Sequence, residues 1–332
     1  MGGLTAGDDG APGRPVLVML AAGMAKRYGG CKPLAPVGLH GEAVIDLNAG
    51  DARRAGFGEI VLVLGPASGP AISYHVRRVW PPSVPVSVAV QAFALGTAHA
   101  VLGTRALVGD RPFAVINADD IYGVPALDRL ARHLVSATDH ALVSYQLRDT
   151  VVSADPLTRG TLEADDEGWL RALVERRGVT RQRDGRFIAD DGLEPKELPG
   201  ETPVSMNLWG FTAAIWPVLE NAVRRVHGDV AADGSVTGQT PASDTEVLLP
   251  EVVGAMITGA SGAMITGDGG AMITGASGAM VTGDGGGRVR VLPGTGRCIG
   301  VTHADDLPVV RTELAEMVGQ GLRAEAPWGT GT

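Results

Sequence analysis

The chain is poor in cysteine, with only Cys31 and Cys298 among its 332 residues. Two cysteines allow one disulfide but not the dense framework of small secreted domains. Together with seven scattered histidines, they show no zinc-type ligand spacing. We therefore expect a cytoplasmic, reducing compartment.

Long apolar runs are also missing, because none reaches the roughly 18–20 residues that a membrane span requires. The run over residues 15–25 ends in small residues, as a signal peptide does. However, an acidic segment precedes it, and Lys26 and Arg27 follow at once. A buried strand that enters a glycine turn explains this stretch better, and we expect no membrane partner.

Positive charge is in the minority, with 28 Lys and Arg against 37 Asp and Glu and a net charge of −9. Such a balance disfavours a nucleic-acid partner. Any anion site must therefore be built locally from a few cations and backbone N–H groups. Apolar residues make up 45% of the chain, which is typical of a globular protein.

Apolar runs and helical patterns alternate through the first half of the chain. Strands are predicted at residues 16–22, 59–65, 85–90, 112–117 and 141–147. Helices are predicted between them at residues 43–56, 71–79, 96–107 and 124–135. This alternation indicates βαβ units, an α/β fold class and a mostly parallel central sheet.

The pattern changes after residue 150. Strands are predicted at residues 161–163, 170–176, 186–189, 203–211, 288–292 and 298–301, and helices at 213–226 and 305–318. We expect a small mixed β subregion that covers the active site at the open end of the parallel sheet. No clean linker is visible, so the prediction is one domain over residues 14–318, with a disordered N-terminus at 1–13 and a disordered tail at 319–332.

A repeat interrupts this second half. Residues 254–285 form four octads of the type GAMITGAS, which are too short to build a solenoid and lack the calcium-binding glycine–aspartate pattern. We interpret residues 254–287 as a low-complexity insertion in a surface loop. An interaction segment is the alternative.

The first chemical motif is the glycine-rich turn after the first strand. A turn without bulky side chains exposes backbone N–H groups to an anion. Its cations and turn residues make a cradle for a triphosphate, with a basic surface turn as the alternative. The residues concerned are Leu20, Ala21, Ala22, Gly23, Lys26, Arg27 and Lys32.

The second motif closes the fourth strand with Asn117, Asp119 and Asp120. A carboxylate at this sheet edge can hold Mg²⁺, which prefers oxygen ligands. We expect Asp119 to be the ligand, although an aspartate after a strand can also serve as a turn or helix cap.

The third motif, between the third strand and the next helix, contains Gln91, Gly96 and Thr97. A glutamine amide offers the donor and the acceptor that a base edge needs. An ordinary helix start is the alternative.

These motifs resemble the sugar-nucleotidyltransferase family, whose members share a three-layer Rossmann-like domain. The similar parts are the Leu-Ala-Ala-Gly turn with its Arg and Lys, the Gln before Gly-Thr, and the strand that ends in Ala118-Asp119. Leu173-Val-Glu175 and the Asn207-Leu-Trp-Gly210 strand extend the resemblance, which covers residues 16 to about 250 and continues weakly to 318.

The resemblance implies that the chain transfers a nucleoside monophosphate from an NTP to a phosphorylated acceptor such as a sugar 1-phosphate, with Mg²⁺ as cofactor. It implies Arg27 and Lys32 as catalytic residues. The implied nucleotide contacts are Leu20, Ala21, Ala22, Gly23, Lys26, Gln91, Gly96, Thr97 and Asn117. The implied acceptor contacts are Asp120, Glu175, Arg176, Asn207 and Gly210. The implied metal ligands are Asp119 and Glu251, with Glu246 as an alternative to the second.

Two departures from the family pattern stand out. Ala25 replaces the second glycine of the turn, and Arg176-Arg177 replaces Lys-Pro. The alternatives are a cytidylyltransferase for another phosphate or phosphonate, a transferase to a molybdenum cofactor, and a non-catalytic nucleotide-binding protein. The base, the acceptor and the oligomeric state, a homo-oligomer included, stay open.

Overall fold

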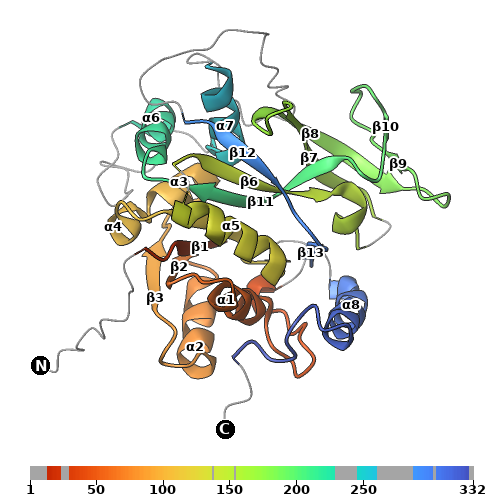
Figure 1. The fold of residues 1–332 in the computed structure, drawn as a ribbon. Coiled ribbons are helices and arrows are strands. Elements are labelled where there is room, and N and C mark those ends of the chain that lie inside the picture. Colours follow the sequence, from red (N-terminus) through yellow and green to blue (C-terminus); the bar gives the residue numbers. More distant parts are fainter. Residues whose placement is uncertain are drawn as a thin grey trace, which may run out of the picture.

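The first four apolar runs form adjacent parallel strands, in the order β3–β2–β1–β4. Helices connect them in the manner of βαβ units (Figure 1). The strands are β1 (Val16–Ala21), β2 (Glu59–Leu64), β3 (Val86–Val90) and β4 (Phe113–Asn117). The connecting helices are α1 (Val44–Arg54), α2 (Gly69–Val79), α3 (Thr97–Leu102) and α4 (Arg105–Val108). The predicted α/β class with a Rossmann-like, largely parallel core is confirmed.

The structure is a computed structural model of the chain. It describes residues 13–23, 30–136, 138–152, 155–228, 245–259, 287–301 and 304–328. None of the helices in these ranges is long and apolar enough to cross a membrane.

The sheet continues past β4 with a strand from the second half of the chain. β11 (Pro203–Phe211) pairs antiparallel with both β4 and β6 (His140–Gln146), and β12 (Val289–Pro293) pairs parallel with β6. The fifth predicted strand, β6, therefore runs in the direction of β4 but is not its neighbour. The edge of β4 is taken by β11, whose Trp209 and Phe211 are fully buried there.

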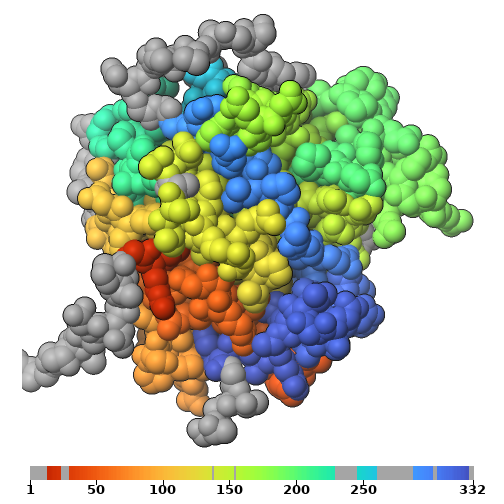
Figure 2. Space-filling model, viewed as in Figure 1, coloured from red at the N-terminus to blue at the C-terminus, as the bar shows by residue number. Residues whose placement is uncertain are grey.

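Four strands form an antiparallel arm beside this sheet. β7 pairs with β11 and β8, β8 with β9, and β9 with β10. The arm projects from the rest of the molecule at the right of Figures 1 and 2. Its strands are β7 (Leu157–Ala164), β8 (Leu170–Arg181), β9 (Phe187–Ile188) and β10 (Glu197–Leu198).

Helices cover both faces of the sheet, which makes three layers. Along β1, Leu17 and Met19 point to one hydrophobic cluster and Val16 and Val18 to the other, because side chains alternate on a strand. The first cluster includes α1, α2 and α5 (Val124–Ser136), and the second includes α3, α6 (Ile215–His227) and α7 (Leu249–Thr258). Burying each such aliphatic side chain contributes about 1.5–3 kcal/mol.

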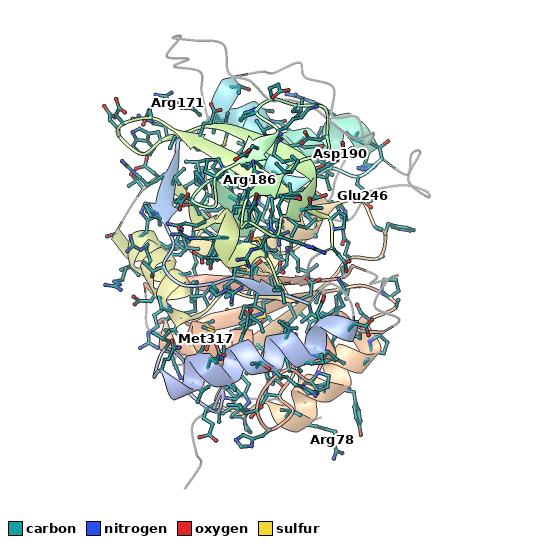
Figure 3. All side chains as sticks on the ribbon, turned by 90° about the vertical axis from the view of Figure 1, so that its right-hand side faces the viewer. Arg78, Arg171, Arg186, Asp190, Glu246 and Met317 are labelled. Carbon is teal, nitrogen blue, oxygen red and sulfur yellow. The ribbon has the colours of Figure 1, made fainter. Side chains whose placement is uncertain are left out.

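A third, smaller cluster lies near the carboxyl end of β4. It joins α8 (Leu307–Gly319) to β13 (Ile299–Gly300), which pairs with β5 (Asp120–Ile121). Figure 3 shows α8 lying across the lower part of the molecule, with Met317 on it. Through this packing, α8 supports the turn that follows β4.

The C-terminal residues that the sequence suggests as a disordered tail are packed against α1 as far as residue 328. Arg323 forms an ion pair with Asp51, with 2.9 Å between Nη2 and Oδ2, and both side chains are buried. The rings of Trp328 and Trp80 have their centroids 5.5 Å apart. The tail prediction missed these contacts because the segment is short and has no periodic apolar pattern.

The repeat begins inside a helix. Its first five residues, 254–258, complete α7, and Gly259 ends the helix in a left-handed conformation with φ +65°. Residues 260–286 lie outside the described residues, so the prediction of a surface insertion stays a prediction for them.

Candidate active site

The ends of β1 and β4 lie side by side. Leu20 is in register with Asn117, and the Ala118 N–H donates to the Leu20 carbonyl oxygen at 3.1 Å. Parallel strands bring their carboxyl ends to one edge of a sheet, which is where open α/β sheets bind ligands. The described beginning of the first motif, at the end of β1, and the carboxylates of the second therefore lie at one edge, as the sequence predicts.

The beginning of the glycine-rich turn is held by the loop after β2. Ser68 Oγ donates to the Ala21 carbonyl oxygen at 2.7 Å. A side chain at Gly65 would come within 2.6 Å of the Ala22 carbonyl oxygen, so that glycine permits the close approach. Gly23 is exposed and faces open space. Residues 24–29, with the predicted contacts Lys26 and Arg27, lie outside the described residues.

Lys32 lies at this same edge of the sheet. It begins the short 3-10 helix η1 (Lys32–Leu34), and its Nζ lies 3.7 Å from Oδ2 of Asp119. The Lys32 side chain is 16% exposed and the Asp119 side chain 37% exposed. At one sheet edge, an accessible cation can contact a bound phosphate, and an accessible carboxylate can hold a metal cation that accompanies it.

Asp120 points the other way, into the protein. Asn117 Nδ2 donates to its Oδ2 at 3.1 Å, and Asn48 Nδ2 donates to its main-chain oxygen at 2.7 Å. Burial and then the charge of Asp119 raise the pKa of Asp120 to about 6. Asp120 thus stabilises the turn through hydrogen bonds inside the protein, whereas the sequence suggests that it contacts the acceptor.

Arg159 on β7 is a charged group near this turn that the sequence did not reveal. Its Nε donates to Thr150 Oγ1 at 3.0 Å and its Nη2 to the Thr150 carbonyl oxygen at 2.6 Å. Burial lowers its pKa, and the charge of Asp120 opposes that shift. Arg159 comes near Asp120 only because β7 joins the sheet by strand pairing. No local sequence motif could therefore have identified Arg159.

The third motif forms a closed loop. The Nε2 of Gln91 donates to the Gly96 carbonyl oxygen at 3.0 Å and also lies 3.2 Å from Nδ1 of His99. Thr97 Oγ1 accepts from the N–H of Leu249 at 2.8 Å, at the start of α7. Gln91 and Thr97 therefore use part of their hydrogen-bonding capacity to hold the loop itself.

Position 96 requires a glycine because of its backbone conformation and its close neighbours. It has φ +94°, and a Cβ would lie 2.3–2.7 Å from backbone atoms of Val247. This close approach lets Val247 exchange two backbone hydrogen bonds with the loop, from the Ala98 N–H to its carbonyl oxygen and from its N–H to the Leu95 carbonyl oxygen, both at 2.9 Å.

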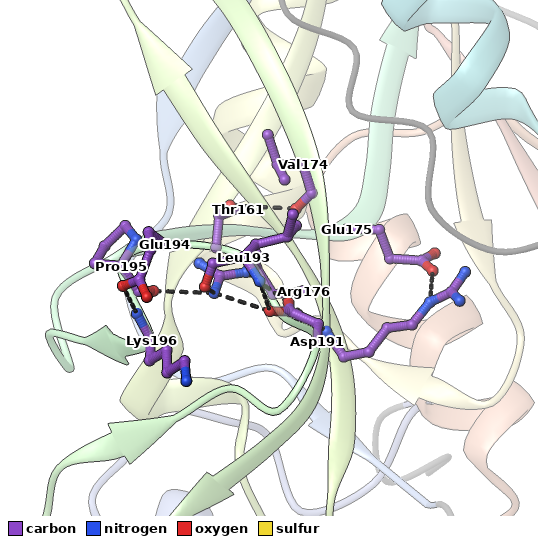
Figure 4. Close-up of polar contacts among 10 residues, drawn as sticks. Thr161, Val174, Glu175, Arg176, Asp191, Leu193, Glu194, Pro195 and Lys196 are labelled. Atoms are coloured by element: carbon purple, nitrogen blue, oxygen red, sulfur yellow. Dashed lines mark hydrogen bonds and ion pairs between the residues drawn. The ribbon is translucent and has the colours of Figure 1, made fainter.

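Glu175 and Arg176 lie on opposite faces of β8. Figure 4 shows Arg176 turned toward Asp191 and Glu175 on the other side of the strand, where it accepts from Arg177 Nε at 2.8 Å. Glu175 is about half exposed, which leaves it accessible to an acceptor.

Arg176 is buried and hydrogen-bonded within the protein. Its side chain is 4% exposed, and its guanidinium donates to Asp191 at 2.7 Å and to the carbonyl oxygens of Leu193 and Pro195. The hydrogen bond from Arg176 lowers the pKa of Asp191 to about 2. Arg176 therefore anchors the loop before β10, and an acceptor contact would require breaking these bonds.

Asn207 lies in a bulge of β11. The pairing with β6 shifts register between Ser205 and Trp209, and Asn207 has φ +59°. Within the described ranges it is the one non-glycine residue with positive φ. Such a conformation costs on the order of 1–3 kcal/mol and tends to occur at ligand sites.

Gly210 has a packing role. A Cβ there would lie 2.6 Å from Leu130 Cδ1 on α5, so the glycine lets the helix approach the sheet. The residue is buried under α5, and the structure does not bring it to an accessible position.

Glu251 lies in the first turn of α7, where the charge of Glu175 acts on it. Burial and then the charge of Glu175 raise the pKa of Glu251, and its Oε2 is buried without a hydrogen bond to the described residues. Glu246, labelled in Figure 3, is exposed. No group of three or more His, Cys, Asp or Glu side chains in the described ranges could hold a metal ion.

The chain matches one family model and the fold of solved structures. The family model described as MobA-like NTP transferase domain matches residues 17–183. Among solved structures, HddC from Yersinia pseudotuberculosis matches both complexed with GMP-PN, with a TM-score of 0.55, and in a second structure, with a TM-score of 0.53. Both are 13% identical to this chain, and the matches cover 90% of it and 99% of HddC, which shows a shared fold. A search of curated proteins finds no match.

Proposed function

Since the chain belongs to the family of MobA-like NTP transferase domains, we propose that it is a Mg²⁺-dependent enzyme that transfers a nucleoside monophosphate to a sugar 1-phosphate. The observation that carries the proposal is the pair of Lys32 and Asp119, 3.7 Å apart at the edge where β1 and β4 end. One group neutralises phosphate charge, and the other is a ligand for the cation that accompanies an NTP.

The reaction is an in-line displacement. An oxygen of the acceptor phosphate attacks the α-phosphorus of the NTP, the bond from that phosphorus to the bridging oxygen breaks, and pyrophosphate leaves. Such a transfer depends on positioning and charge neutralisation more than on a covalent nucleophile. In this proposal Lys32, together with Arg27, neutralises the departing pyrophosphate, and the N–H groups of the glycine-rich turn orient the phosphates.

The residues at the edge fit magnesium. Mg²⁺ keeps several waters and binds through one or two carboxylates plus substrate phosphates, so a site with few protein ligands suits it. Asp119 is accessible and would hold the ion, while Asp120 is engaged with Asn117. When bound, the ion would neutralise charge on the α-phosphate.

The acceptor side of the proposal is supported by two positions. Glu175 is accessible on β8, and Asn207 is held in its unusual conformation on β11. A carboxylate and an amide are suited to sugar hydroxyl groups, because they accept hydrogen bonds from them. HddC, whose fold is similar, was crystallised with GMP-PN, which makes GTP the first nucleotide to try.

The test is a screen of pyrophosphate release by the full chain. Each of the four NTPs is combined with Mg²⁺ and with a panel of sugar 1-phosphates, other phosphates and phosphonates, and a molybdenum cofactor acceptor. We expect release with one sugar 1-phosphate and its loss with EDTA. Release only with a non-sugar acceptor would overturn the sugar assignment. Tight NTP binding without release from any acceptor would favour a non-catalytic nucleotide-binding protein.

A further inference from the structure

The antiparallel pairing of β4 and β11 stops two residues short of Asn117 on β4 and of Asn207 on β11, both of them predicted ligand-binding residues. Phe113 is in register with Phe211, and Val115 with Trp209. The same register would pair Ile116 with Leu208 and then Asn117 with Asn207, but β11 bulges there. The bulge removes ladder partners from the backbone groups of this region.

The hydroxyl of Tyr122 fills this gap. The Asn117 N–H donates to it at 3.1 Å, and the hydroxyl donates to the Met206 carbonyl oxygen at 2.7 Å. Tyr122 is 1% exposed, so both bonds are shielded from water. Burial raises the pKa of Tyr122 well above its ordinary value, which keeps the proton that the second bond requires.

Both ends of this bridge lead to the candidate site. Asn117 donates from its side chain to Asp120, next to the Lys32–Asp119 pair. Met206 directly precedes Asn207 in the bulge. The hydroxyl therefore joins the turn of the metal ligand to the strand of the acceptor contact.

We propose that Tyr122 is a positioning residue that holds the turn carrying Asp119 in fixed register with the bulge carrying Asn207. Its role is to align the NTP with the acceptor, and this inference rests on the proposed function. Alignment acts on the rate of transfer, because small misplacements of the reacting groups are costly.

The chain supplies a matched control. Tyr145 is also 1% exposed, and its hydroxyl donates to the main-chain oxygen of Tyr122 at 3.0 Å. Tyr145→Phe removes a buried hydroxyl of the same kind but leaves the bridge from Asn117 to Met206 in place. Tyr122→Phe and Tyr145→Phe should both lower the Tm, by about 2–8 °C, since each leaves buried polar groups unpaired.

The experiment compares kcat and KM of the two variants and the wild type. Tyr122→Phe should reduce kcat by about 10- to 100-fold, with the KM for NTP changed by less than about threefold. Tyr145→Phe should keep kcat within about threefold. Equal losses in the two variants, or wild-type kcat in Tyr122→Phe, would overturn the inference.

A second readout does not depend on turnover. In the wild type, adding an NTP with Mg²⁺ should slow amide hydrogen exchange in β11, and in Tyr122→Phe it should not. Equal slowing in both proteins, or no slowing in the wild type, contradicts the coupling. If the wild type shows this coupling but releases no pyrophosphate from any acceptor, the proposed function fails while the bridge stands.

Discussion

The Nζ of Lys32 lies 3.7 Å from Oδ2 of Asp119, although the two residues come from distant parts of the chain. Lys32 begins η1, after the glycine-rich turn, and Asp119 follows β4. The distance is that of an ion pair between two groups that solvent still reaches, so the pair can open to admit a phosphate and its cation. Loss of either member should therefore affect catalysis more than stability, because ion pairs that solvent still reaches contribute only about 0–1 kcal/mol.

Lys32→Ala should reduce turnover about a hundredfold while the protein stays folded, since it removes one group that stabilises developing charge. Steady-state pyrophosphate release measures the loss, and circular dichroism checks the fold. Lys196→Ala is the control, because Lys196 is exposed and lies next to β10 of the arm. Near-normal turnover in Lys32→Ala would remove this residue from the mechanism.

Gly96→Ala should lower the free energy of unfolding by about 2 kcal/mol or more, because the new Cβ would collide with the backbone of Val247 in addition to the strain of φ +94°. Gly185→Ala is the matched control: Gly185 has φ +87°, and nothing lies within 4 Å of its Cβ position. Urea unfolding of both variants separates the collision from the strain. Equal costs would show that the contact with Val247 yields without penalty.

His140 should make stability depend on pH. Its Nδ1 accepts from the Thr212 N–H at 3.2 Å, and burial lowers its pKa from 6.5 to about 4. Below pH 6.5 the unfolded chain binds a proton that the folded protein excludes. The free energy of unfolding should therefore fall as the pH drops from about 6.5 to 4, by on the order of 2–3 kcal/mol from this residue.

His140→Asn should flatten that dependence, because asparagine can accept from the Thr212 N–H without titrating. Urea unfolding of the wild type and the variant at pH 7.5, 6.0 and 5.0 gives the comparison. The difference between the two curves isolates His140 from other groups that titrate in this range. Parallel curves would contradict the assignment.

Deletion of residues 260–285 should leave turnover within about twofold, if the repeat is an inert insertion as its composition indicates. Deletion of residues 254–285 should instead impair folding, because it removes the last five residues of α7, of which Gly254 is buried. Activity and Tm of the two deletions test the boundary. A large loss of activity in the shorter deletion, with an unchanged Tm, would favour a functional role for the repeat.

The strands and helices of the first half could be predicted because each has a strong local pattern. The order of the strands beyond β4 could not be predicted, because the sequence of residues 203–211 does not indicate which strands will lie next to this one. Its place between β4 and β6 follows from burying Trp209 and Phe211 in the layer of α6 and α7. The C-terminal residues around Arg323 are a similar case, since their packing depends on an ion pair with Asp51, which lies far earlier in the chain.

The site was predictable where topology alone decides it. The carboxyl ends of parallel strands lie at one edge of a sheet, so Leu20 and Asn117 could be placed at the same edge, and the structure shows that they are neighbours there. The assignment of both Glu175 and Arg176 to the acceptor neglected the alternation of side chains along a strand, which places adjacent residues on opposite faces. Asn48 and Tyr122 escaped notice because their contacts depend on tertiary packing that no local motif encodes.

The ion pair of Arg323 with Asp51 has a consequence for biosynthesis. The chain emerges from the ribosome in sequence order, so α1 is made long before the cation that neutralises its buried carboxylate, and before Trp328 reaches Trp80. Until then the carboxylate of Asp51 has only Arg54 of the same helix as a partner, at 3.6 Å, and the nascent β1–α1 unit must keep this acid partly hydrated. The earliest-made helix of the protein should thus be among the last to acquire native protection from solvent.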